Sequence, residues 1–136
     1  MPASIVFTSG AVIDVLGLAN VATAPRKRGQ GEGEKLMRAV VEYMRTVEAA
    51  RGAEARPLVG FCLHSNAGFY AKCGFGVVEG AAQRFQYTAA ASPRESGHLA
   101  DPTFTDDDVF CNSEAADLIA AIRANGDRVA ISRRHW

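Results

Sequence analysis

The fold is decided by residues 21–38, which read VATAPRKRGQGEGEKLMR. This stretch places a short apolar segment, a basic loop punctuated by glycines and a strongly helical segment in immediate succession. Gly29, Gly31 and Gly33 let the backbone turn sharply and approach a ligand closely. Consecutive N–H groups at the start of the helix can then converge on a phosphate. The stretch therefore predicts an anion site between a strand and a helix.

The segments around this loop predict an α/β fold. From Gly33 to about Arg51, apolar residues recur at helical spacing. The buried face of this helix is predicted to carry Leu36, Val40, Met44 and Val47, flanked by Met37, Val41 and Tyr43. Residues 58–63 are apolar throughout, as in a central strand covered on both faces, and we expect them to pair in parallel with residues 18–23. Residues 4–24 predict two short strands joined by a turn.

Shorter elements are predicted after this strand. Residues 65–73 predict a helix capped by Ser65 or Asn66, and a strand is expected at 75–78. Weaker patterns predict a strand at 84–88, a loop or linker at 89–108 with a solvated run of aspartates at 106–108, a helix at about 113–125 capped by Ser113, and a last strand or tail at 128–136. We therefore expect a domain at residues 1–88 and an extension at residues 89–136.

Composition limits the function classes. The chain has 136 residues, enough for one hydrophobic core, and its 15 Lys and Arg residues balance 15 Asp and Glu residues. A net charge of zero removes the general attraction to nucleic acid. No apolar run approaches the roughly 20 residues of a membrane span, and no signal peptide pattern begins the chain. Three cysteines without metal-ligand spacing predict buried free thiols, no metal site and a soluble, cytoplasmic protein.

Two motifs resemble those of the GNAT family of N-acetyltransferases. Residues 28–33, RGQGEG, fit the signature Arg/Gln-x-x-Gly-x-Gly/Ala, with a predicted strand before it and a helix after it. Residues 66–75, NAGFYAKCGF, are similar to the second acetyl-CoA motif of the family. The resemblance implies the acyl-CoA N-acyltransferase fold, a mixed sheet with flanking helices. It also implies acetyl-CoA as co-substrate and a small-molecule primary amine as acceptor.

The resemblance further implies roles for single residues. The cofactor-binding residues that it implies are Val21, Ala22, Thr23, Arg28, Gly29, Gln30, Gly31, Glu32, Gly33, Asn66 and Tyr70. Amides of residues 28–33 would hold the diphosphate, and the backbone edge of residues 21–23 would pair with the pantetheine arm. A splayed strand there would leave an amide for the thioester carbonyl.

Tyr70 is implied as the proton donor to the departing thiolate. On its own, a tyrosine such as Tyr70 is more often a packed core aromatic with a satisfied hydroxyl, and it is the motif that favours a catalytic role. His64 lies near the expected thioester, where it could relay a proton, although an ordinary exposed or capping histidine is the simpler interpretation. Cysteine catalysis is disfavoured, since apolar neighbours raise the pKa of a thiol.

Within the family, the second motif is similar to that of the eukaryotic glucosamine 6-phosphate N-acetyltransferases, which implies a role in UDP-N-acetylglucosamine biosynthesis. Positions that are acidic in those enzymes hold Phe61, Ala19 and Asn20 here. The family places further elements ahead of the loop, so the domain is expected to be shortened at its N-terminus. The sheet edge that this exposes would be covered by the C-terminal residues or by a second copy in a homodimer. Another amine acceptor, or a non-catalytic CoA-binding fragment, remains an alternative.

Overall fold

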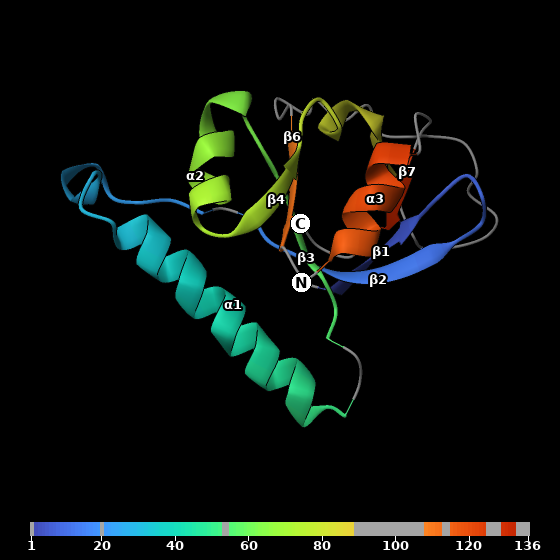
Figure 1. Cartoon of the computed structure of the whole chain (residues 1–136), viewed down its shortest axis with the longest axis horizontal. Coiled ribbons are helices and arrows are strands. Elements are labelled where there is room, and N and C mark those ends of the chain that lie inside the picture. Colours follow the sequence, from blue (N-terminus) through green and yellow to red (C-terminus); the bar gives the residue numbers. More distant parts are fainter. Residues whose placement is uncertain are drawn as a thin grey trace.

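The computed structural model of the chain describes residues 2–19, 21–52, 55–88, 108–112, 115–124 and 129–132. Within them, seven strands form one sheet in the order β4-β6-β3-β2-β1-β7-β5 (Figure 1). The strands are β1 (Pro2–Val6), β2 (Val12–Gly17), β3 (Leu58–Cys62), β4 (Phe75–Val78), β5 (Phe85–Thr88), β6 (Asp108–Asn112) and β7 (Val129–Ser132). The α-helices are α1 (Glu32–Ala50), α2 (Ala67–Lys72) and α3 (Ala116–Ala124), and short 3-10 helices occupy Pro25–Lys27, His64–Asn66 and Ala82–Arg84. The mixed sheet with flanking helices confirms the predicted α/β class.

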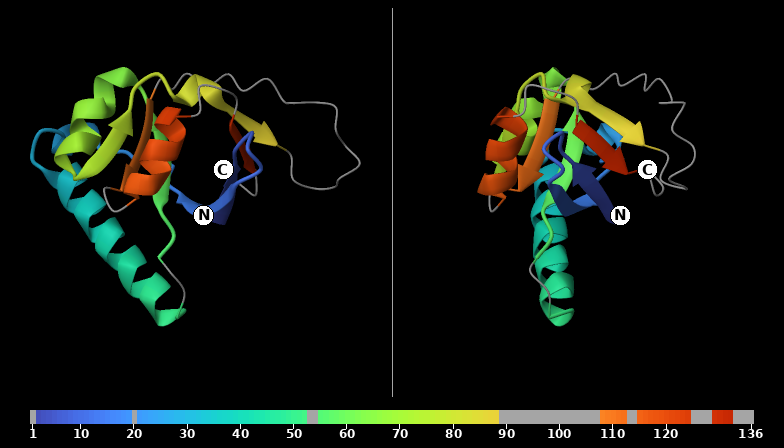
Figure 2. Two further views of the ribbon diagram at one scale, coloured as in Figure 1. Left: turned by 45° about the vertical axis from the view of Figure 1, so that its right-hand side comes forward. Right: turned by 90° about the vertical axis from the view of Figure 1, so that its right-hand side faces the viewer.

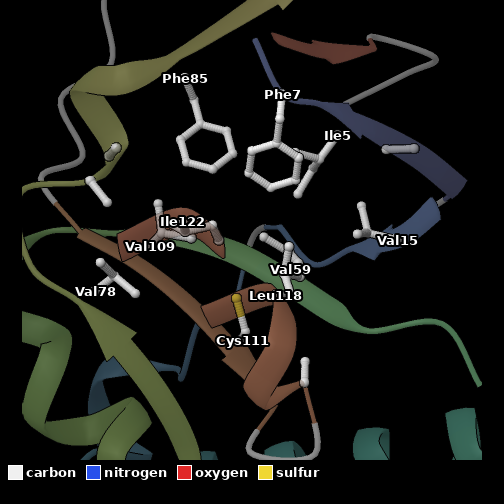
Figure 3. Packing of buried hydrophobic residues seen from close by; sticks show 14 residues of the cluster. Ile5, Phe7, Val15, Val59, Val78, Phe85, Val109, Cys111, Leu118 and Ile122 are labelled. Carbon is white, nitrogen blue, oxygen red and sulfur yellow. The ribbon is translucent and has the colours of Figure 1, made fainter. Parts of the chain in front are cut away.

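Helices cover both faces of the sheet. Helices α1 and α2 lie on one side and α3 on the other (Figures 1 and 2). Leu118 and Ile122 of α3 pack against Val15 and Val59 of the sheet in the larger core cluster (Figure 3). The second cluster joins α1 and α2 to the opposite face through Met37, Tyr70, Leu16, Leu58, Cys62, Phe75 and Phe110. Strand β3 is therefore covered on both faces, as predicted.

The predicted parallel pairing through α1 is present, but its first strand lies earlier in the chain than predicted. Strand β2 pairs with β3 at Leu16–Leu58 and Gly17–Val59, whereas the described residues 18, 19 and 21–23 are not part of a strand. The hairpin with β1 explains this difference: it pairs Pro2–Val6 with residues 12–16 around a turn in which Gly10 has a φ of 85°. In that register residues 12–17 form β2, and the described part of the predicted strand 18–23 follows it outside the strand.

The buried stripe of α1 is rotated from the predicted one. Met37 is fully buried, whereas Leu36 and Tyr43 are 47% and 67% exposed. Val40 and Met44 are half-buried, as expected for residues that border the stripe. The sequence also gave no reason to bury Glu48, whose carboxylate forms two hydrogen bonds with the Arg56 guanidinium, at 2.8 and 2.7 Å.

The described C-terminal segments belong to the same sheet rather than to an appended unit. Strand β6 lies between β3 and β4, and β7 lies between β1 and β5. Asp108, predicted in a solvated loop, begins β6 and is 1% exposed, so that prediction is wrong for this residue. Residues 89–107, including the other two aspartates of the run, and the predicted cap Ser113 lie outside the described residues.

The edge of β1 that was expected to be open is covered by β7, which pairs with it at Ile5–Ile131 and Val6–Ala130. Of the two predicted coverings, the chain's own C-terminal residues supply this one, and the homodimer stays a prediction. Among the described residues, no helix is both long enough and apolar enough to cross a membrane.

Candidate functional site

A groove of about 710 Å³ lies between the glycine loop and α2. Its lining residues are Val21, Ala22, Thr23, Lys27, Arg28, Gly29, Gly31, Glu32, Gly33, Glu34, Asn66, Phe69, Tyr70 and Lys72. The structure thus brings together every predicted cofactor-binding residue except Gln30. The side chain of Gln30 instead donates a hydrogen bond from Nε2 to the carbonyl of Arg26 at 3.0 Å, within the loop itself.

The loop has the backbone geometry that its glycines predict. Gly29 and Gly31 have φ values of 75° and 77°, in the left-handed region that side chains disfavour. Gly33 is needed for another reason: a Cβ there would lie 3.2 Å from the ring of Phe69 and 3.2 Å from Oγ1 of Thr23. Helix α1 therefore begins in close contact with α2, and a larger residue at this position would require Phe69 or Thr23 to shift by a few tenths of an ångström.

Side chains around the loop hold it in this shape. Arg28 donates a hydrogen bond from Nε to the carbonyl of Thr23 at 3.1 Å. In the first turn of α1, Glu32 pairs with Lys35 at 3.2 Å and Glu34 with Arg38 at 2.7 Å. The opening N–H groups of an α-helix have no acceptor within the helix, and its dipole attracts anions. The paired carboxylates reduce the negative charge that these residues would otherwise place beside the groove.

The segment 21–23 lines the groove without being a strand, which corrects the predicted regular strand edge. One residue beyond the end of β2, the Leu18 N–H donates a hydrogen bond to the Val59 carbonyl of β3, at 2.8 Å. Beyond it the chains diverge, and a second cavity of about 230 Å³ opens between them. This cavity is lined by Leu18, Ala19, Val21, Phe61, Cys62, Leu63, Asn66 and Tyr70. A cavity thus lies between the two segments at the place where a splay is expected.

Tyr70 lines both the groove and the smaller cavity, and so do Val21 and Asn66. Its ring is stacked on Phe110, with centroids 3.8 Å apart and planes at 12°. The tyrosine is 7% exposed and also meets Phe69 edge to face at 5.1 Å. Tyr70 is thus a packed core aromatic that at the same time borders both hollows.

Helix α2 differs in one detail from its prediction. It begins at Ala67 after a 3-10 turn, and Asn66 makes no capping hydrogen bond with its side chain. The helix ends as predicted before Gly74, whose φ is 89°. Asn66 therefore presents its side chain from the start of the helix while it lines the groove.

Sequence reasoning missed two contributors to this region, both on β6. One is Phe110, on which Tyr70 stacks. The other is Asp108, whose Oδ2 lies 2.9 Å from Nδ1 of His64 and whose Oδ1 accepts the N–H of Gly80 at 2.9 Å. Neither residue stands near a recognisable motif, so no local signal could have placed them here.

The cysteines have the character of structural thiols. Cys62 and Cys111 are buried and Cys73 is half-buried, and none of the three is in a disulfide. Burial raises the pKa of Cys73, and it raises that of Cys111 to about 12. A thiol with a raised pKa is a poor nucleophile at neutral pH. The interpretation of these residues as non-catalytic is consistent with these shifts.

Comparison with known families gives one match. The model of the acetyltransferase (GNAT) domain matches residues 3–77, which is more than half of the chain. The matched residues include the glycine loop and the segment 66–75. Searches of curated proteins and of solved structures gave no match.

Proposed function

Because the chain belongs to the GNAT acetyltransferase family, we propose that it binds acetyl-CoA in the groove between the glycine loop and α2. We further propose that it transfers the acetyl group to a primary amine at the cavity where β2 and β3 diverge. The observation that carries this proposal is that one groove joins both motifs, residues 28–33 and 66–75, to the segment 21–23.

The groove supplies what the co-substrate requires. A diphosphate needs dense N–H donors and positive charge, which the amides of residues 28–33 provide together with Lys27, Arg28 and Lys72. The irregular backbone of residues 21–23 can hydrogen-bond to the peptide-like pantetheine arm. An arm lying along it would end at the smaller cavity, which shares Val21, Asn66 and Tyr70 with the groove.

The reaction needs no covalent intermediate on the protein. Acetyl-CoA supplies an activated carbonyl carbon, which the amine nitrogen attacks directly. A main-chain amide at the point of divergence is the proposed donor to the carbonyl oxygen as it gains charge. The hydroxyl of Tyr70 is the proposed donor of a proton to the CoA thiolate when the C–S bond breaks.

For the acceptor, glucosamine 6-phosphate is the first amine to test, because residues 66–75 follow the pattern of the enzymes that use it. A second class of acceptor, amines without a phosphate, also deserves testing. The described residues that line the smaller cavity include no cationic side chain that could bind a phosphate. Arg84, a cation that follows this motif in the chain, donates a hydrogen bond from Nη1 to the Ile122 carbonyl of α3 at 3.4 Å. Primary amines with apolar bodies therefore belong in the same assay.

Cofactor binding is tested by calorimetric titration of the purified chain with acetyl-CoA. The informative variant is Gly31→Ala, and its matched control is Gly10→Ala. Both glycines have positive φ and open space around the missing Cβ, so each variant is strained by about 1–2 kcal/mol. Only Gly31 lines the groove, so we expect Gly31→Ala alone to weaken acetyl-CoA binding. Equal affinity in both variants, or no binding by the wild-type chain, would refute the proposed site.

Catalysis is tested by thiol release from acetyl-CoA with glucosamine 6-phosphate, glucosamine, phenethylamine and a peptide with a free N-terminus. Tyr70→Phe keeps the ring that stacks on Phe110 and removes the hydroxyl alone. We expect kcat to fall by about 10²–10⁴-fold with little change in acetyl-CoA affinity. Tight acetyl-CoA binding with no turnover on any amine would instead identify a non-catalytic CoA-binding chain.

A further inference from the structure

We propose that His64 accepts the proton that the acceptor amine loses during acetyl transfer, with Asp108 as the residue that positions it. This inference rests on the proposed function and adds to it a residue pair that neither motif contains. The pair consists of His64, in the 3-10 turn after β3, and Asp108, the first residue of β6. Nδ1 of His64 lies 2.9 Å from Oδ2 of Asp108.

The register of the sheet places this pair at the end of β3 where the two parallel strands diverge. Asp108 lies opposite Cys62, the last residue of β3, in the antiparallel ladder. Successive side chains of a strand alternate between faces, so Asp108 shares the face of Phe110. Phe110 is the ring on which Tyr70 stacks. Asp108 therefore stands two residues along the strand from the partner of the proposed proton donor.

The neighbours of His64 in the chain line the smaller cavity. Leu63 and Asn66 both border it, and so does Cys62. The side chain of His64 itself is 65% exposed. The turn that carries His64 thus borders the cavity in which we place the amine, through Leu63 and Asn66 on either side of the histidine.

The hydrogen bond to Asp108 also decides which nitrogen can act. An ionised carboxylate only accepts hydrogen bonds, so neutral His64 carries its proton on Nδ1 and its lone pair on Nε2. Asp108 is 1% exposed, and its second oxygen is fixed by the N–H of Gly80 at 2.9 Å. A buried carboxylate with a hydrogen-bond partner on each oxygen thus holds the orientation of an imidazole that is largely exposed to solvent. This is the arrangement in which an aspartate orients a histidine as base.

The proton transfers balance as follows. The amine arrives as an ammonium ion and gives one proton to Nε2 of His64. Its lone pair then forms the C–N bond at the acetyl carbonyl, and collapse of the intermediate breaks the C–S bond. The CoA thiolate takes a proton from Tyr70, which regains one from the nitrogen as that becomes an amide. His64 returns its proton to water, so one proton is released for each amide formed.

The test is the pH profile of kcat/KM in wild type, His64→Gln and Asp108→Asn, measured with the amine of the assay panel that gives the highest turnover. Other titratable groups on the elements that meet here are Cys62 on β3, Tyr70 and Lys72 on α2, and Glu79 after β4. Among the described carboxylates, Asp108 lies within hydrogen-bond distance of His64, at 2.9 Å. The matched control is Ser65→Ala, an exposed neighbour in the same turn.

We expect His64→Gln to lower kcat/KM by about 10²–10⁴-fold and to abolish the acidic limb of the profile, with acetyl-CoA affinity unchanged within twofold. Asp108→Asn keeps an oxygen for Gly80 and should move the acidic limb to lower pH, because the carboxylate favours protonated His64. Ser65→Ala should match wild type. Added imidazole should restore turnover to His64→Ala, a rescue that a purely structural histidine would not show.

Two results overturn the proposal. One is a His64→Gln variant with the rate and acidic limb of wild type, which would leave the acetyltransferase function standing. The other is a wild-type chain that turns over no amine, in which case both proposals fail together. If Asp108→Asn does not fold, His64→Gln and the imidazole rescue still decide the outcome.

Discussion

The sharpest prediction concerns Gly60→Ala, a single methyl group placed in the middle of β3. Gly60 is buried on the face that carries α2. A Cβ at this position would lie 2.7 Å from Cε1 of Phe110, closer still to its Cζ, and 2.8 Å from the carbonyl oxygen of Leu18. The substitution therefore presses on the ring beneath Tyr70 and on the backbone where the parallel strands separate.

The cost follows from these distances. Carbon atoms pack favourably at about 3.5–4.0 Å, so the Phe110 ring would have to move by about 1 Å. Leu18 cannot move freely, because its N–H is bonded to the Val59 carbonyl at 2.8 Å. Overpacking of this kind destabilises the fold by about 2–3 kcal/mol. Alanine also lowers the conformational entropy of the unfolded chain, which stabilises the fold by less than about 1 kcal/mol. We expect a net loss of about 2 kcal/mol, or about 8 °C in Tm for a chain of this size.

Activity should fall as well, since Tyr70 stacks on the ring that moves. A displacement of about 1 Å at a catalytic group costs about 10²-fold in rate. The matched control is Gly76→Ala on β4, whose Cβ would meet only the flexible end of Ile119 at short range, on the α3 face. Thermal unfolding and acetyl-CoA turnover are measured on both variants. A Gly60→Ala chain with the Tm and kcat of wild type would refute the argument, as would equal losses of activity in the two variants.

Two further predictions follow from the titratable groups. The hydrogen bond from Arg56 holds the pKa of Glu48 at about 2 instead of its ordinary 4.5, so this carboxylate stabilises the fold above pH 4.5 and ceases to do so as the pH falls toward 2. The measurement is Tm as a function of pH for wild type and Glu48→Gln. The loss of stability between pH 4.5 and 2 that is due to Glu48 should be absent from the variant, and parallel curves for the two proteins would contradict this. For the thiols, Ellman's reagent at pH 8 should label Cys73 first and slowly, and Cys111 only on unfolding, because burial raises both pKa values. Fast labelling of Cys111, identified by mass spectrometry, would contradict its burial.

The elements predicted best are those whose ends carry their own signals. Helix α1 was expected from Gly33 to about Arg51 and runs from Glu32 to Ala50. A left-handed glycine precedes it and another follows it, at Gly31 and Gly52, so both ends are fixed by local backbone chemistry. Strands β3 and β4 were located to within a residue for a similar reason, since a turn or a helix end bounds each apolar run.

Elements whose position depends on a distant partner were predicted less well. The two apolar runs at 12–17 and 18–23 look alike as sequences, and the hairpin with β1 selects the first. Likewise, periodicity identified the apolar side of α1 but not its rotation, which buries Met37 and exposes Leu36. Both choices are made by packing against chain that the local pattern does not contain.

The candidate site shows the same division. The loop residues of the groove were predicted because alternating glycines before a helix are typical of an anion-binding loop, whereas residues 21–23, Asn66 and Tyr70 were predicted from the family resemblance. Asp108 was misassigned because a run of acidic residues is usually solvated, and only pairing with β3 and β4 carries this aspartate into the interior.

The position of β6 bears on the domain boundary that is expected at residue 88. Strand β6 separates β3 from β4 and carries both Phe110, under Tyr70, and Asp108, beside His64. All of β6 lies beyond residues 3–77, which the family model matches. The two motifs therefore line the groove, but the residues that pack and orient the proposed reacting groups come from a strand some forty positions after Tyr70. We expect a chain cut at residue 88 to keep both motifs and to lose the strand that contacts Tyr70 and His64.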